Sequence, residues 1–171
     1  ATTKISETAK LAMLSAMEKD WYNPSSLYTP GQQASGTLMD ARVRIAHCLG
    51  CLPKEIYFTS GGSEADNQAI LSAAAIGKRQ GKMHIISTAF EHHAVLHTLK
   101  KLEKEGFEIT LLDVGEKGIV SPVQVEKAIR PDTILVTVMY ANNEIGTIQP
   151  IREIGAICRK NGVLFHTDAV Q

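Results

Sequence analysis

Cysteine is scarce in this sequence, which has only Cys48, Cys51 and Cys158 among its 171 residues. An odd and small number of cysteines does not form the disulfide framework on which small secreted domains depend, and it fits a reducing compartment. A chain of this length buries roughly 70% of the surface that it exposes when unfolded, so its core needs no covalent support. We therefore expect a cytoplasmic protein.

An excess of charge of either sign is also absent, because 18 Lys and Arg residues balance 18 Asp and Glu residues. Proteins that bind nucleic acids or membrane surfaces rely on surplus Lys and Arg to meet phosphate groups, so we expect neither partner. No apolar run approaches the roughly 18 residues that cross a bilayer. The first residues, ATTKISETAK, lack the basic and apolar regions of a signal peptide.

What the sequence does contain is a regular alternation of two hydrophobic patterns. Helical spacing predicts helices over residues 6–20, 32–49, 92–105, 123–129 and 151–160, and a further alanine-rich helix within GGSEADNQAILSAAAIG. Short β-prone runs predict strands over residues 55–60, 84–88, 107–114, 133–139 and 163–167. Strands alternating with helices indicate an α/β fold, a three-layer αβα arrangement around a mostly parallel sheet. The run 133–139 is so apolar that we expect it to be buried on both faces.

The beginning of the chain differs from the rest. We divide it into a helical segment with a proline-rich loop, residues 1–50, and a partial α/β domain, residues 51–171. The sequence stops a few residues after the last predicted strand, with no helix to cover the sheet. We therefore expect this chain to be the front part of a larger unit.

Ligands of open α/β sheets bind at the carboxyl ends of the strands, and polar residues gather at several of these ends. The segment Thr59–Glu64 contains two glycines before a helix, an arrangement that suits an anion, since a helix N-terminus carries a partial positive charge. Ser63 could donate to a phosphate oxygen, or it could cap the helix with Asp66 three residues on. Both interpretations stay open on the residues alone.

Two histidines follow the strand over 84–88. An imidazole there could stack on an aromatic ligand or act as an acid or base. His93 and His97 have the spacing of metal ligands, but a third ligand is missing, so we expect no metal and read His97 as a solvated helix residue. The pair Cys48 and Cys51 straddles a predicted helix end, and we read it as two half-buried thiols rather than a redox or zinc site.

The last two strand ends carry amides and a carboxylate. Asn142 and Asn143 follow the most apolar strand, where they could contact a ligand or form an Asx-turn. Asp168 follows the final strand, a costly place for a charge unless it is paired. A protonated heterocyclic nitrogen would be a suitable partner, although Asp168 could also cap a following helix.

Taken in order, the segments FTSGGSEADN, EHHAV, ANNEIGTIQPI and FHTDAVQ closely resemble the cysteine desulfurases, the NifS/IscS-like branch of the class V aminotransferases. Such enzymes depend on pyridoxal 5′-phosphate (PLP) and have the fold of type I PLP enzymes, in which residues 51–171 would belong to the large domain. The resemblance implies that Gly62 and Ser63 bind the cofactor phosphate. It also implies that His92 stacks on the pyridine ring and assists proton transfer as a catalytic residue.

The resemblance assigns three more cofactor-binding residues. Asn143 matches an asparagine near the phenolic oxygen of PLP and the substrate. Asp168 matches the carboxylate that keeps the pyridine nitrogen protonated, so that the ring can accept electrons. Gln171 matches a glutamine that donates to the phenolic oxygen. L-cysteine as substrate, a homodimer partner and a sulfur-acceptor scaffold protein for iron–sulfur cluster or thio-cofactor synthesis are implied in the same way.

The resemblance also shows what this sequence lacks. The Schiff-base lysine and the nucleophilic cysteine of the family lie beyond the Asp–Gln segment, so we expect the 171-residue chain alone to be inactive. One alternative is a selenocysteine lyase or another class V aminotransferase. A second is a non-catalytic PLP-fold scaffold domain, and a third is a zinc or redox protein built on Cys48 and Cys51.

Overall fold

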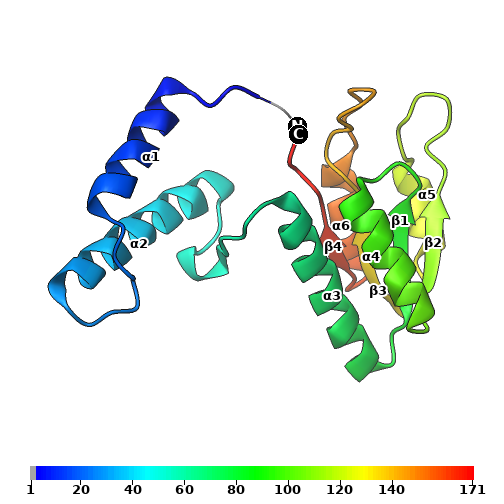
Figure 1. Ribbon diagram of the computed structural model, residues 1–171. Helices are drawn as coiled ribbons and strands as arrows, with labels where there is room; N and C mark the ends of the chain where they lie inside the picture. Colours follow the sequence, from blue (N-terminus) through cyan, green and yellow to red (C-terminus); the bar gives the residue numbers. More distant parts are fainter. Residues whose placement is uncertain (1–2) are drawn as a thin grey trace. The chain divides into compact units, whose positions relative to one another are not determined.

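A computed structural model describes residues 3–171 (Figure 1). The chain divides into two compact units, one that ends at Phe58 and one that spans Thr59–Gln171. Among the described residues, no helix combines the length and apolar composition needed to span a bilayer. The division at residue 50, made on the sequence, stays a prediction.

The unit that ends at Phe58 is helical, with α1 (Glu7–Lys19), α2 (Thr29–Leu49) and a 3-10 turn, η1 (Pro53–Glu55). Ser6 caps α1, because its hydroxyl accepts a 3.2 Å hydrogen bond from the amide of Ala9. The second helix begins three residues earlier than predicted, since Pro30 sits in its first turn, where a missing N–H costs nothing. It ends as predicted at Gly50, whose φ of 66° terminates the helix.

The predicted strand over residues 55–60 is wrong. Residues 56–59 have no regular secondary structure and pair with no strand in the described part of the chain. Tyr57 is 81% exposed and Phe58 is 46% exposed, so neither aromatic side chain packs on a sheet. A β-prone run becomes a strand only when a neighbouring strand satisfies its amides and a face buries its side chains.

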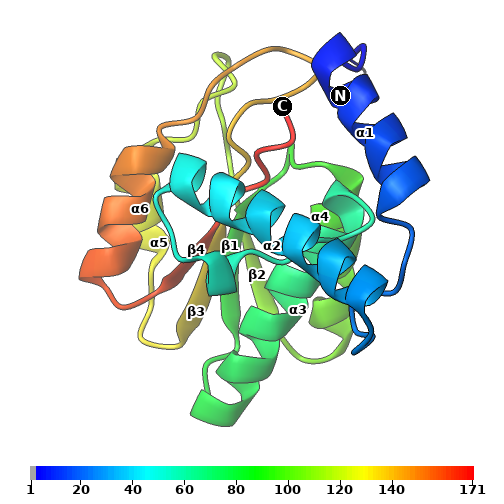
Figure 2. The ribbon, with the colours of Figure 1, turned by 90° about the vertical axis from the view of Figure 1, so that its left-hand side faces the viewer.

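The unit Thr59–Gln171 is a parallel sheet between two layers of helices. Its strands are β1 (His84–Thr88), β2 (Glu108–Leu112), β3 (Thr133–Thr137) and β4 (Leu164–His166), in the order β2-β1-β3-β4, and all three pairings are parallel. Figure 2 shows α3 (Gly62–Gln80) and α4 (His93–Lys104) on one side of the sheet and α5 (Pro122–Ala128) and α6 (Ile151–Lys160) on the other. The three-layer α/β prediction is confirmed.

Two apolar clusters, one on each face of the sheet, hold these layers together. Ile85 points toward α3 and α4, where it meets Ile70 and Leu99. Its neighbour Ile86 points toward α5 and α6 and packs near Ile154. Consecutive residues of a strand face opposite sides, so a strand covered on both faces must be apolar throughout. All five residues of β3 are buried, as its sequence predicts.

Gly77 lies near the end of α3, against Lys82 in the following turn and Ile134 of β3, and a side chain there has no room. A Cβ atom would lie 2.5 Å from the carbonyl oxygen of Lys82 and 3.1 Å from Cγ2 of Ile134. We expect Gly77→Ala to lower the free energy of unfolding by about 2 kcal/mol, because a backbone carbonyl cannot move aside as a flexible side chain can. Urea unfolding followed by circular dichroism measures this change.

Gly155 in α6 provides the matched control. A Cβ atom there would make an ordinary 3.4 Å contact with Phe165. Alanine has a higher helix propensity than glycine, so Gly155→Ala should raise the free energy of unfolding by up to about 1 kcal/mol. Equal effects of the two substitutions would show that α3 does not approach the sheet this closely.

Candidate functional site

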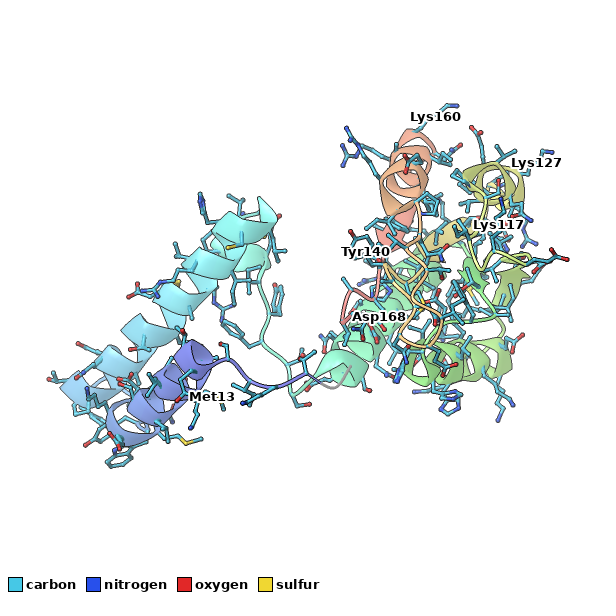
Figure 3. The ribbon with its side chains drawn as sticks, turned by 90° about the horizontal axis from the view of Figure 1, so that it is seen from above. Met13, Lys117, Lys127, Tyr140, Lys160 and Asp168 are labelled. Carbon is cyan, nitrogen blue, oxygen red and sulfur yellow. The ribbon has the colours of Figure 1, made fainter. Side chains whose placement is uncertain are left out.

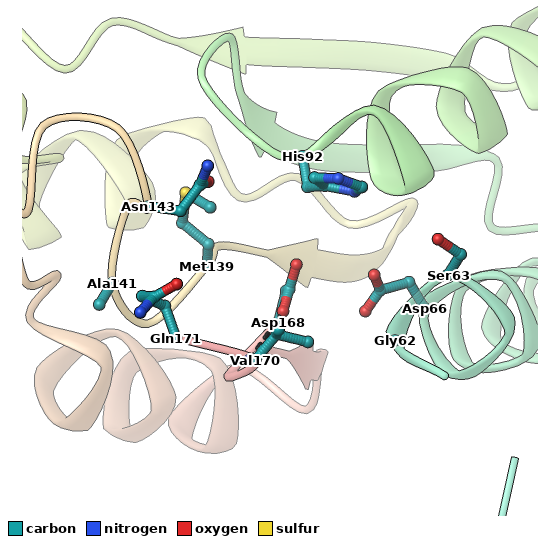
Figure 4. A pocket seen from close by; sticks show the side chains of 10 residues that line it. All are labelled: Gly62, Ser63, Asp66, His92, Met139, Ala141, Asn143, Asp168, Val170 and Gln171. Atoms are coloured by element: carbon teal, nitrogen blue, oxygen red, sulfur yellow. Dashed lines mark hydrogen bonds between the residues drawn. The ribbon is translucent and has the colours of Figure 1, made fainter. Parts of the chain in front are cut away.

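A cavity of about 190 Å³ opens at the carboxyl ends of the strands (Figure 4). It lies where the strand order changes direction, between β1 and β3, which is where open α/β sheets bind their ligands. The lining comes from α3, from the loops after β1 and β3, and from the segment after β4. The lining residues are Gly62, Ser63, Asp66, His92, Met139, Ala141, Asn143, Asp168, Val170 and Gln171. All six residues predicted to bind the cofactor are among them.

The first turn of α3 forms one wall of the cavity. The helix begins at Gly62 with Gly61 as its N-cap, and no side chain caps it. The capping interpretation of Ser63 with Asp66 is therefore wrong, because Ser63 already lies inside the first turn. The earliest amide of this turn with a backbone partner is that of Ala65, so the amides of residues 62–64 have no helical carbonyl to bind. Together with the Ser63 hydroxyl they offer donors to an anion.

Gly62 has no side chain, and a side chain at this position would collide with a neighbouring residue. A Cβ atom at this position would lie 2.7 Å from Cγ2 of Val170, which also lines the cavity. The carboxylate of Glu64 is engaged at the same turn, since it accepts hydrogen bonds from the Ser60 hydroxyl at 2.6 Å and from the Ser60 amide at 2.7 Å. These bonds lower the pKa of Glu64. The Glu64 carboxylate of this turn is therefore hydrogen-bonded to Ser60.

His92 stands at the N-terminus of α4 and its ring faces the cavity (Figure 4). Its Nδ1 atom accepts a 3.1 Å hydrogen bond from the amide of Ala94, which makes His92 the N-cap and fixes the orientation of the ring. His93 and His97 stack on each other with ring centroids 5.3 Å apart, and both are exposed. No cluster of three metal-binding side chains occurs within residues 3–171.

The two asparagines after β3 have different roles in the structure. Asn142 is buried, and its Oδ1 accepts from the amides of Glu144 at 2.8 Å and Ile145 at 3.0 Å, which is the Asx-turn. Its Nδ2 donates to the carbonyl of Phe90 at 3.1 Å. Asn143 is exposed and lines the cavity. The Asx-turn is therefore confirmed for Asn142, whereas contact of Asn143 with a ligand stays a prediction.

Asp168 lies at the floor of the cavity and is 9% exposed. Its backbone continues the pairing of β3 with β4, because the amide of Tyr140 donates to the Asp168 carbonyl at 2.8 Å. Its Oδ1 accepts from the amide of Val170 at 3.0 Å. No Lys or Arg of the described part of the chain forms a salt bridge with it. A buried carboxylate with so few partners fits a cationic ligand atom.

Two further carboxyl groups lie beside Asp168, and the sequence did not single them out as site residues. Asp66 is 4% exposed, and its Oδ1 lies 3.4 Å from Nε2 of His166. Burial, reinforced by the charge of Asp168 and opposed by His92, raises the pKa of Asp66 to about 6. Burial lowers the pKa of His166, although Asp168 opposes this shift.

Glu91 is 5% exposed. Burial is the largest cause that raises the pKa of Glu91 to about 7. Hydrogen bonds from Thr88 and Met139 act in the opposite direction, while the charges of Asp168 and Asp66 add to the rise. Glu91 stood in the EHHAV motif beside the histidine that the resemblance selected. A charged residue in the short loop after a buried strand was the available signal.

Among the described residues, neither a lysine nor a cysteine lines the cavity. Figure 3 shows Lys127 and Lys160 on the outer sides of α5 and α6, pointing away from Asp168. The three cysteines are free thiols. Cys48 is exposed rather than half-buried as predicted.

Comparison with known proteins adds a decisive observation, since the family profile "Aminotransferase class-V" matches residues 1–171. The chain belongs to the class V aminotransferase family. The enzyme "Cysteine desulfurase IscS" of Methanosarcina thermophila is 52% identical to this class V aminotransferase over 171 residues, which are 100% of this chain and 42% of the relative. The chain thus spans less than half the length of that relative.

Solved structures agree with this assignment. A structure described as a NifS-like protein superimposes with a TM-score of 0.94 at 37% identity and covers 99% of this chain and 47% of its own. Another, described as SspA in complex with cysteine, has a TM-score of 0.93 at 39% identity over 99% of this chain and 49% of its own. These matches confirm the resemblance to NifS/IscS-like proteins that the motifs indicated.

Class V aminotransferases use PLP, and the cavity of this family member fits that cofactor. PLP carries a phosphate group and a pyridine nitrogen that becomes cationic when protonated. The free amides of residues 62–64 suit the phosphate. The buried carboxylate of Asp168, without a Lys or Arg partner in the described chain, suits the protonated nitrogen.

Proposed function

We propose that the complete protein is a PLP-dependent cysteine desulfurase and that this chain supplies its amino-terminal part. The reaction would convert L-cysteine to L-alanine and leave the sulfur on the enzyme as a persulfide. The observation that carries this proposal is the convergence of the α3 turn, His92 and buried Asp168 on one cavity. A relative 52% identical to the chain and described as a cysteine desulfurase supports the choice of reaction within the family.

The α3 turn would bind the phosphate of PLP. Its free amides point to the open end of the helix, where the helix dipole favours an anion, and the Ser63 hydroxyl adds a further donor. Gly62 carries no side chain over this turn, so the phosphate could come close to the backbone. This turn would place one end of the cofactor.

Four side chains would orient the ring and its substituents. Asp168 would hold a proton on the pyridine nitrogen, and when bound, PLP would then draw electrons away from the α-carbon of the substrate. His92 would stack on the ring and accept or deliver protons at the substrate. Asn143 and Gln171 would donate hydrogen bonds to the phenolic oxygen. The position of these side chains around Asp168 in one cavity supports this assignment (Figure 4).

The lysine and the cysteine that complete the chemistry would come from outside this chain. We further propose a homodimer, a sulfur-acceptor scaffold protein as partner, and a role in iron–sulfur cluster or thio-cofactor synthesis. Three free thiols support a reducing, cytoplasmic location. The neighbour described as SspA in complex with cysteine supports L-cysteine as the substrate.

A titration and an assay on the complete protein test the proposal. We expect saturable uptake of PLP, followed by absorbance, and release of alanine from L-cysteine in the presence of a thiol that accepts the sulfur. His92→Ala should weaken PLP binding about tenfold, since stacking of an aromatic ring contributes about 1–1.5 kcal/mol. His97→Ala is the matched control, because His97 is exposed on α4 and does not line the cavity.

Each competing function predicts a different result. Alanine released from selenocysteine but not from cysteine would indicate a selenocysteine lyase, and transamination between amino-donor pairs would indicate another class V aminotransferase. Failure of the complete protein to take up PLP would favour a scaffold domain and reject the proposal.

A further inference from the structure

Glu91 makes a connection that the proposed function does not use. It follows β1 in the short loop that leads to His92, and its side chain turns inward until only 5% of the residue is exposed. Its Oε1 atom accepts two hydrogen bonds, one from the Thr88 hydroxyl at 2.7 Å and one from the Met139 amide at 3.0 Å. Thr88 is the last residue of β1, and Met139 lies just beyond β3. The carboxyl group therefore bridges the two strands at the switch point.

A second bond joins the same two loops. Asn142 donates from Nδ2 to the carbonyl of Phe90 at 3.1 Å. The backbone immediately before His92 is thus fastened to the segment after β3 at two consecutive residues, Phe90 and Glu91. His92 itself is held from the other side by the amide of Ala94. The backbone position of His92 therefore depends on the Glu91 bridge. The orientation of its ring depends on the first turn of α4.

The environment of Glu91 explains why a carboxyl group can occupy this site. The titratable groups that face it are Asp66 on α3 and Asp168 after β4, and both would repel a second negative charge. Its Oε2 atom is buried and has no hydrogen-bond partner among the described residues. A buried polar atom without a partner is costly, so a bridge of this kind persists only where it serves another purpose.

We propose that Glu91 is a positioning residue, whose buried carboxyl group fastens the loop that carries His92 to the end of β3 and so sets the place of the imidazole in the cavity. This inference rests on the proposed function, because it deepens the assignment of His92 to the cofactor ring. It names a residue that acts through His92 and does not itself line the cavity.

Substitutions in the complete protein separate the bridge from general packing. Glu91→Leu removes the acceptor and leaves the Met139 amide unpaired, so we expect the dissociation constant for PLP to rise about tenfold. Glu91→Gln keeps an acceptor oxygen at the position of Oε1 and should stay within about threefold of the wild type. Glu103→Gln, on the exposed side of α4, is the control and should have no effect.

A double-mutant cycle shows whether Glu91 acts through His92. When the ring is already removed by His92→Ala, the further change Glu91→Leu should alter the dissociation constant by less than about twofold, because coupled residues are not additive. Equal factors in both backgrounds would show that Glu91 only supports the fold. Failure of Glu91→Gln to restore binding would also overturn the inference.

An NMR measurement that does not require PLP tests the role of Glu91 separately from the proposed function. In the protein labelled with ¹³C-histidine, the His92 resonance, assigned by its loss in His92→Ala, should move in Glu91→Leu and stay in place in Glu91→Gln. An unmoved resonance in Glu91→Leu rejects the inference even where PLP binds. If the wild-type protein takes up no PLP, the proposed function fails, and this resonance still decides the role of Glu91.

Discussion

Asp168→Asn in the complete protein is expected to lower the rate of alanine release from L-cysteine by about 10²- to 10³-fold, the size of effect seen when one preorganised electrostatic contact is removed from an active site. Asparagine has nearly the shape of aspartate and can keep the 3.0 Å hydrogen bond from the Val170 amide. The backbone bond from Tyr140 to residue 168 is also unaffected. What disappears is the negative charge at the floor of the cavity, and with it the partner of a protonated pyridine nitrogen. Steady-state kinetics at saturating PLP measure the change.

Asp113→Asn provides a control with the same local geometry. The Oδ1 atom of Asp113 accepts from the amide two residues on, that of Gly115, at 2.9 Å, as Asp168 does with Val170. Asp113 is exposed and does not line the cavity, so its substitution should leave the rate within about twofold of the wild type. If Asp168→Asn also retained most of the activity, the charge of Asp168 would not serve the ring nitrogen.

The sequence predicted the position of a strand correctly where a β-prone run also has neighbouring strands and helices to pack against. The apolar run over 133–139 became the fully buried strand β3 because helices cover both of its faces. The run over 55–60 had the same β-prone character but no neighbouring strand in the described chain. The local preference for β structure is the same in both runs. They differ in whether a neighbouring strand is available, and the residues of one segment do not show this.

The cavity itself could be anticipated from topology, because residues at the carboxyl ends of parallel strands meet at one edge. The directions in which individual side chains point within the cavity could not be anticipated in this way. Asn142 and Asn143 are adjacent and chemically identical, yet one closes an Asx-turn and the other faces the cavity. Ser63 matched a capping pattern, but the helix starts at Gly62 and leaves its hydroxyl inside the first turn.

The inward turn of Glu91 was the largest omission. Its neighbour His92 drew attention because histidine chemistry is visible in a sequence, whereas the burial of a carboxyl group depends on the loop that folds over it. The same holds for Asp66, whose spacing from Ser63 indicated a cap and whose side chain instead lies near His166. The charge of Asp168 raises the pKa of both carboxyl groups, yet the sequence identified only Asp168 of these three acidic residues.

The two raised carboxyl pKa values predict that the cofactor-free protein loses stability as the pH rises. In the folded state Glu91 has a pKa of about 7 and Asp66 of about 6, both above the values of an unfolded chain. Between the two pKa values of each group the folded state binds more protons than the unfolded state, so stability falls with increasing pH. For Glu91 this window runs from 4.5 to about 7 and corresponds to roughly 3 kcal/mol.

Glu91→Gln should remove this dependence, because an amide does not titrate. We expect the free energy of unfolding of the variant, relative to the wild type, to improve by about 3 kcal/mol between pH 4.5 and pH 7.5. His166, whose pKa is lowered, opposes the trend at low pH in both proteins and cancels in their difference. Urea unfolding at each pH gives the values, and Glu103→Gln on α4 should show a difference that stays near zero throughout. A constant difference for Glu91→Gln would mean that the carboxyl group is ionised in the folded protein over the whole range, and that burial beside Asp66 and Asp168 does not hold its proton.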